Sequence, residues 1–168
     1  MSINIALIGM PGSGKTAIGE KIAKKLSMDF VDMDEMIELN EGKSIAEIFK
    51  NGEDYFRSLE TDCAKVLGSR ESSVISTGGG IVKKKENIDY LKKNSIIIFI
   101  NRHPDSIVND VDIQKRPLLK DGVQIIYKLY DERIDLYKKY CDIEVINDKG
   151  IDEAIRKIIA VTLSPGEE

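Results

Sequence analysis

Apolar runs of strand length alternate along this chain with segments in which apolar residues recur at helical spacing. Short runs rich in β-branched residues predict strands at 3–8, 30–31, 74–76, 95–100 and 143–146. Helical spacing predicts helices at 15–26, 53–67, 123–139 and 152–163. Continuously apolar strands joined by helices are typical of α/β domains whose parallel sheet is covered on both faces. In such sheets, ligands bind at the carboxyl ends of the strands.

Composition narrows the classes of function. The 168 residues fit a single domain, and 42% hydrophobic with 32% charged residues is ordinary for a soluble globular protein. A net charge of −4 gives no global basic field to hold nucleic acid. Two cysteines are too few for a disulfide framework or a zinc site, and no run approaches the length of a membrane span. We expect a cytoplasmic protein that contacts neither membrane nor nucleic acid, and a monomer, since no long exposed apolar face is evident.

The stretch from Gly9 to Thr16 reads Gly-Met-Pro-Gly-Ser-Gly-Lys-Thr, the full phosphate-loop pattern, between a predicted strand and a predicted helix. Its glycines let successive backbone N–H groups face phosphate oxygens, and the helix that follows adds its positive dipole end. Lys15 is expected to neutralise the β- and γ-phosphates, and Thr16 to ligate Mg²⁺. We therefore predict ATP and Mg²⁺ as cofactors. The predicted ATP-binding residues here are Gly12, Ser13, Gly14, Lys15, Thr16 and Ala17.

Two carboxylates follow the second predicted strand, in the sequence Asp32-Met33-Asp34. If both lie on the strand, their spacing directs them to the same side, toward the cleft. One could then support the magnesium ion while the other orients or deprotonates an attacking hydroxyl. The alternative is that Asp34 caps a helix that begins at Glu35.

Two further features have a structural and a functional interpretation. Arg57 and Glu60 are i, i+3 neighbours on a predicted helix, which fits a solvated surface pair. Lysine is the commoner cation in this chain, however, and an arginine at such a position indicates recognition of a carboxylate or phosphate. The three consecutive glycines 78–80 are hard to justify as a mere turn, and they favour close backbone approach to a ligand.

Together these motifs resemble the shikimate kinase family over about residues 5–146. The arginine-bearing helix, the triple glycine and an Arg-Pro-Leu-Leu segment make the resemblance more specific than the phosphate loop does. In chain order the matching motifs are Gly9–Thr16, Asp32-x-Asp34, Phe56-Arg57-x-x-Glu60, Ser76-x-Gly-Gly-Gly80, Arg116-Pro-Leu-Leu119 and Arg133-x-x-x-Tyr137.

The resemblance implies a single domain, residues 1–168, of the P-loop kinase type, with a three-layer α/β/α fold around a five-stranded parallel sheet. A substrate-binding helical segment would cover about 33–62 and a mobile lid about 109–122. The implied activity is transfer of the ATP γ-phosphoryl group to the 3-hydroxyl of shikimate, giving shikimate 3-phosphate and ADP, in chorismate and aromatic amino-acid biosynthesis.

The resemblance also implies residue roles. Arg57 and Arg133 would clamp the shikimate carboxylate, Asp34 would hold the hydroxyls and assist the reacting one, and backbone N–H groups of the triple glycine would donate. The implied shikimate-binding residues are Asp34, Arg57, Gly78, Gly79, Gly80 and Arg133. Asp32 would support Mg²⁺ beside Thr16, and Phe49, Phe56 and Leu118 would line the pocket. The implied catalytic residues are Lys15, Asp34 and the lid residue Arg116, which would also bind ATP and reach the transferred group.

One position departs from the family pattern. Members commonly carry an arginine seven residues before the lid arginine, where it stacks on adenine, and this chain has Asn109 there. The residues that contact adenine are therefore not identified.

Two other functions fit parts of the sequence. A related small-acid kinase, such as a gluconate kinase, shares the phosphate loop and needs a carboxylate clamp. A catalytically weak nucleotide-binding regulator would keep the scaffold, but it would not need Lys15, Thr16, Asp34 and Arg116 together.

Overall fold

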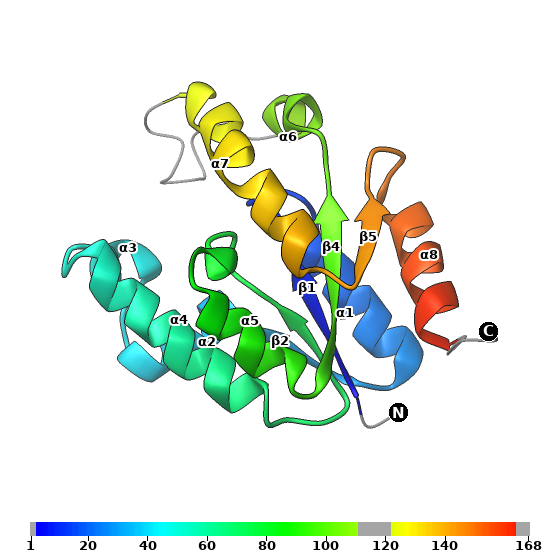
Figure 1. Cartoon of the computed structure of the whole chain (residues 1–168), viewed down its shortest axis with the longest axis horizontal. Coiled ribbons are helices and arrows are strands. Elements are labelled where there is room, and N and C mark those ends of the chain that lie inside the picture. The colour runs from blue at the N-terminus through cyan, green and yellow to red at the C-terminus, as the bar shows by residue number, and fades with distance from the viewer. Residues whose placement is uncertain (1–2, 111–121, 164–168) are drawn as a thin grey trace.

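Five parallel strands form the centre of the fold, in the order β2–β3–β1–β4–β5 (Figure 1). The structure is a computed structural model, and it describes residues 3–110 and 122–163. The strands are β1 (Asn4–Ile8), β2 (Asp29–Asp32), β3 (Ser73–Ser76), β4 (Ser95–Asn101) and β5 (Ile143–Ile146). The expected parallel sheet of five strands is confirmed.

The central strand β1 contributes side chains to both apolar cores of the domain. All five of its residues are buried, and successive side chains point to opposite faces of the sheet. Ile5 and Leu7 pack into one apolar cluster, and Ala6 and Ile8 pack into the other. A strand covered on both faces must be apolar at every position, which is why its pattern is continuous rather than alternating.

Helices cover both faces, as Figure 1 shows. The helices α1 (Lys15–Leu26) and α8 (Ile151–Leu163) pack on the face that carries Ile5 and Leu7. The other face is covered mainly by α4 (Glu53–Leu67), α5 (Lys85–Lys92) and α7 (Gln124–Tyr140). The remaining elements are α2 (Met33–Glu41), α3 (Ile45–Phe49), the 3₁₀ turn η1 (Ile81–Lys83) and α6 (Pro104–Asp110).

Most of the predicted element boundaries lie within a residue of the observed ones, but the helices α3, α5 and α6 were not predicted. Each has at most eight residues, so its apolar spacing covers too few turns to stand out. In α3 the helix start is instead set by a capping box, in which the Ser44 hydroxyl and the Glu47 carboxylate each bond the other residue's backbone N–H.

Three strands end together and thereby bring distant motifs to one edge of the sheet. Ser76, the last residue of β3, pairs with Asp32 of β2 on one side and with Leu7 of β1 on the other. The phosphate loop follows β1, Asp32 ends β2 with Asp34 just after it, and the triple glycine follows β3. These motifs therefore share the carboxyl edge of the sheet, where ligands of such folds bind.

In the part of the chain that the structure describes, no helix is both long enough and apolar enough to cross a membrane. Cys63 is buried and Cys141 is partly buried, and neither is in a disulfide. Burial raises the pKa of the Cys63 thiol to about 12, so this cysteine remains a protonated, unreactive part of the core.

Candidate active site

A cleft of about 640 Å³ opens above the carboxyl ends of β1, β2 and β3. It is lined by most of the residues that the sequence singled out, although they come from five separate segments of the chain. Those residues are Gly12, Lys15, Thr16, Asp32, Asp34, Phe49, Phe56, Arg57, Gly78, Gly79, Gly80 and Arg133. Ser13, Gly14 and Ala17 lie in the phosphate loop or the first turn of α1 without lining the cleft. Arg116, Leu118 and nearly all of the lid segment 109–122 fall outside the described residues.

The phosphate loop curls around the side chain of Lys15. The Lys15 Nζ donates hydrogen bonds to the carbonyl oxygens of Gly9 and Met10 at 2.8 and 2.9 Å, and the side chain is buried. Gly14 is the N-cap of α1 with φ of 97°, a conformation that favours glycine, and no side chain caps the helix. The start of α1 is thus open to an anion, although the N–H of Ser13 donates within the loop to the carbonyl of Met10.

A cluster of oxygen atoms lies beside the loop. The Thr16 hydroxyl donates to Asp32 Oδ2 at 2.8 Å and lies 3.2 Å from the Ser76 hydroxyl. The other oxygen of Asp32 accepts from the backbone N–H groups of Asp34 and Glu35. Hydroxyl and carboxylate oxygens are ligands suited to Mg²⁺, so the donor set fits that ion. No group of three or more His, Cys, Asp or Glu side chains suited to a metal occurs in residues 3–110 and 122–163.

The structure corrects both interpretations of the aspartate pair. Strand β2 ends at Asp32 and helix α2 begins at Met33, so Asp34 is in the first helical turn and not on the strand. Asp32 is the N-cap residue, and Asp34 is not. Both carboxylates nevertheless line the cleft. The change from strand β2 to helix α2 therefore brings Asp34 to the cleft, and the predicted alternation along a strand does not.

The environment of Asp34 favours its protonated form. Loss of solvation by burial raises the pKa of this carboxyl above its usual range, and the nearby charge of Asp32 raises it further. Lys15 and Arg57 act in the opposite direction. A carboxylate with a raised pKa accepts a proton more readily than an ordinary aspartate does, which suits a group that assists a reacting hydroxyl.

Arg57 and Glu60 form a buried ion pair, so the surface-pair interpretation is wrong. The Arg57 Nη1 lies 2.6 Å from Glu60 Oε2, and the two side chains are 10% and 1% exposed. The Arg57 Nε also donates to Glu53 Oε1 at 3.2 Å. Two carboxylates therefore fix the plane of the guanidinium group while it faces the cleft. Burial raises the pKa of Glu60, and the adjacent Arg57 opposes that shift.

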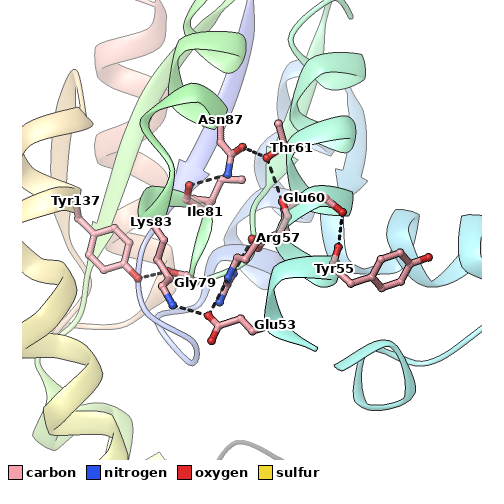
Figure 2. A network of polar contacts seen from close by, with 11 residues as sticks. Glu53, Tyr55, Arg57, Glu60, Thr61, Gly79, Ile81, Lys83, Asn87 and Tyr137 are labelled. Atoms are coloured by element: carbon pink, nitrogen blue, oxygen red, sulfur yellow. Dashed lines mark hydrogen bonds and ion pairs between the residues drawn. The ribbon is translucent and has the colours of Figure 1, made fainter. Parts of the chain in front are cut away.

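Glu53 and Lys83 are site residues that the sequence did not single out. The Lys83 Nζ contacts the same Glu53 oxygen that Arg57 does, and Figure 2 shows Glu53 between the two cations. Both residues line the cleft. Lys83 follows the triple glycine while Glu53 begins α4, so the ion pair joins the two walls of the cleft. The two residues are 30 positions apart, so the sequence carries no local signal of this ion pair.

The triple glycine packs against protein as well as facing the cleft. A Cβ atom on Gly80 would lie 2.2 Å from Arg57 Nη1, and one on Gly79 would lie 2.6 Å from Pro11 Cδ. At Gly78 the nearest atoms would be carboxylate oxygens of Glu60 and Asp34, at 3.0 and 3.1 Å. Glycine is thus required here because the phosphate loop and the Arg57 guanidinium approach the backbone closely.

Arg133 lines the same cleft from helix α7. The residue as a whole is only 9% exposed, and the same is true of Arg57. Buried guanidinium groups on two elements that line one cleft are suited to a planar anion such as a carboxylate, which accepts two parallel hydrogen bonds from each guanidinium. The resemblance implied this pairing, and the fold brings residues 57 and 133 to the same cavity.

Replacement of Asp34 by asparagine is expected to abolish turnover and to stabilise the fold near neutral pH. The folded protein holds the Asp34 proton more tightly than the unfolded chain does, so ionisation of Asp34 lowers the free energy of unfolding as pH rises. Asp34→Asn should therefore melt a few degrees above the parent protein at about pH 7.5. The gain should vanish below about pH 4, where an unfolded aspartate is protonated. Thermal melts across this range test the expectation, and a gain that grows on acidification would contradict it.

The chain is similar to known proteins over nearly its whole length. Residues 11–163 match the family model described as shikimate kinase. A shikimate kinase from Clostridium botulinum is 48% identical over 164 residues, which are 98% of this chain and 99% of that protein. The solved structure of shikimate kinase from Acinetobacter baumannii in complex with shikimate has a TM-score of 0.92 at 30% identity, and covers 100% of this chain and 97% of that one. A gluconokinase from Sinorhizobium meliloti shares the fold alone, with a TM-score of 0.64 at 18% identity over 95% of this chain and 90% of that one.

Proposed function

Because this chain belongs to the shikimate kinase family, we propose that the cleft described above is the site at which it transfers a phosphoryl group from ATP to shikimate. The protein is an ATP-dependent phosphotransferase that acts on a hydroxyl group of shikimate, in the shikimate pathway. The observation that carries the assignment of the cleft is the pair of buried arginines, Arg57 and Arg133, which line it together with the phosphate loop.

The acceptor binds, in this proposal, between the two arginines and Asp34. The guanidinium groups of Arg57 and Arg133 hold the shikimate carboxylate, which fixes the position and the orientation of the ring. Asp34 accepts a hydrogen bond from the 3-hydroxyl and turns it toward the γ-phosphate. Phe49 and Phe56, whose ring centroids lie 4.5 Å apart, line the cleft with apolar surface against which the carbon ring packs.

The phosphates of ATP bind at the phosphate loop, where the predicted residues 12–17 surround them. The ammonium of Lys15 faces the β- and γ-phosphates, and backbone N–H groups at the start of α1 stabilise their charge. A magnesium ion, held by Thr16 directly and by Asp32 through water, would neutralise the charge that develops on the phosphate oxygens. Arg116, on the lid segment 109–122, would also bind ATP and reach the transferred phosphoryl group. Closure of that lid would exclude water.

Catalysis rests on position and charge more than on covalent chemistry. Phosphoryl transfer passes through a loose transition state, so the chain mainly needs to align the hydroxyl with the γ-phosphate and to stabilise negative charge. Asp34 takes the proton of the hydroxyl as its oxygen bonds to the γ-phosphorus, while the bond from that phosphorus to the bridging oxygen breaks and ADP leaves. Its raised pKa brings the carboxylate closer to the strength that this step needs.

A cytoplasmic monomer is also part of the proposal. Support for a reducing compartment comes from the two cysteines, both of which are free thiols. The proposal also includes a single domain with a substrate-binding segment at about 33–62. Its support is that α2, α3 and α4 contribute residues to the lining of the cleft.

Release of ADP in a coupled assay tests the function against its alternatives. Shikimate should stimulate the release strongly, whereas gluconate and nucleoside monophosphates should not. Stimulation by gluconate in place of shikimate would indicate the small-acid kinase alternative. If no acceptor stimulated the release, the protein would be a nucleotide-binding regulator and the proposal would be wrong.

A further inference from the structure

Tyr137 is a buried phenol that reaches the triple-glycine turn from helix α7. Its side chain is 0% exposed, and its ring stacks on Phe99 with centroids 5.0 Å apart. The hydroxyl donates to the carbonyl oxygen of Gly79 at 2.5 Å. Figure 2 shows Tyr137 on one side of Gly79 and Arg57 on the other. A buried tyrosine hydroxyl needs a partner, and here the partner is a backbone atom of the cleft wall.

The geometry of the peptide bond gives this contact a consequence for the cleft. Gly79 C=O and Gly80 N–H belong to one peptide unit, which is trans, so the two groups point in opposite directions. When Tyr137 holds the carbonyl on its own side, the N–H of Gly80 is directed away from α7, toward the side on which Arg57 lies. Gly80 lines the cleft and packs on the Arg57 guanidinium.

The N–H of Gly80 is positioned to donate to a ligand. None of the described residues accepts a hydrogen bond from it, although the carbonyl of the same residue accepts from the N–H of Lys83. The neighbouring parts of the turn are held by other groups. Thr77 Oγ1 donates to the carbonyl of Leu7, and Asn87 Nδ2 donates to the carbonyl of Ile81. Among the described residues, Tyr137 alone hydrogen-bonds the peptide between Gly79 and Gly80.

We propose that Tyr137 is a positioning residue for the acceptor: by holding the Gly79 carbonyl, it aims the Gly80 N–H at the substrate carboxylate beside Arg57. The inference rests on the proposed function of the cleft. It adds a neutral backbone donor to the two guanidinium groups, and a donor that is already held in place loses little conformational entropy when the ligand binds. Burial raises the pKa of Tyr137 to about 12, against the neighbouring Arg133, so the phenol keeps its proton over the working range of pH.

The Tyr137→Phe variant tests this role, because it removes the hydroxyl and keeps the ring that stacks on Phe99. The KM for shikimate should rise about tenfold, which corresponds to the loss of one hydrogen bond to a charged group. The KM for ATP should stay within about twofold of the parent value. A merely structural tyrosine would lower the melting temperature and leave this ratio unchanged.

Tyr130→Phe is the matched control, since Tyr130 lies on the same helix and makes no hydrogen bond to a described residue. It should leave both KM values unchanged. Calorimetric titration with shikimate tests the role of Tyr137 separately from the existence of the shikimate site. Equal shikimate affinity in the parent and Tyr137→Phe proteins would overturn the role of Tyr137 and leave the site in place. A parent protein that bound no shikimate would overturn the site and the role together.

Discussion

Replacement of Lys15 by alanine is expected to reduce turnover by at least about a thousandfold, the scale for loss of a central charge from a phosphoryl-transfer site. The ammonium of Lys15 is buried in the phosphate loop and held by the carbonyl oxygens of Gly9 and Met10. In that position it is the cation of the described residues best placed to face the β- and γ-phosphates. Steady-state ADP release at saturating ATP and shikimate measures the effect.

A control is needed because the two loop carbonyls also lose their partner in this variant. Binding of shikimate, measured by calorimetry without nucleotide, should remain close to that of the parent, since Arg57 and Arg133 are unchanged. Retained turnover in Lys15→Ala would contradict the role of the phosphate loop. Loss of shikimate binding together with turnover would indicate a wider structural failure and would remove support for a local role.

Replacement of Arg133 or Arg57 by alanine is expected to weaken shikimate binding by about 2–5 kcal/mol, the range for removal of one partner of a buried charged hydrogen bond. ATP binding should survive in both variants. The Arg57 change should also lower stability, because it leaves the buried carboxylate of Glu60 without its 2.6 Å partner. Arg133→Ala is therefore the cleaner probe of the clamp, and a double variant Arg57→Ala/Glu60→Gln separates the loss of binding from the cost of an unpaired charge.

Lys138→Ala provides a matched control for Arg133, because it removes an exposed cation from the same helix outside the cleft. It should leave shikimate affinity unchanged. If Arg133→Ala lost as much affinity for ATP as for shikimate, the two arginines would not be a specific clamp for the acceptor. If Lys138→Ala weakened shikimate binding to a similar extent, the effect would be one of net charge rather than of geometry.

The sequence predicted the parallel sheet and its main helices because continuous apolar strands and long amphipathic helices leave repeated local signals. Helix α1 begins and ends at the predicted residues, Lys15 and Leu26, and α4 does so at Glu53 and Leu67. Asp34 is a different case. The pattern Asp-x-Asp fits both a strand and a helix start, and only the observed cap at Asp32 decides between them.

Contacts between distant segments could not be predicted. The spacing of Arg57 and Glu60 identified the pair, but its burial depends on the elements that cover α4. The ion pair of Glu53 with Lys83 and the hydrogen bond of Tyr137 with Gly79 join residues 30 and 58 positions apart. Each contact forms only when the fold brings the two segments together at the cleft. Contacts of this kind, between site residues that are distant in the chain, leave no local signal in a single sequence.

The central claim is that Arg57, Arg133 and Asp34 position shikimate for attack on ATP bound at the phosphate loop. A crystal structure of the protein with shikimate and ADP tests it most directly. The account predicts the carboxylate between the two guanidinium groups, within hydrogen-bond distance of the Gly80 N–H, and the 3-hydroxyl beside Asp34 and directed at the phosphate loop. Shikimate bound outside the cleft, or inside it with the carboxylate toward Lys15, would contradict the account.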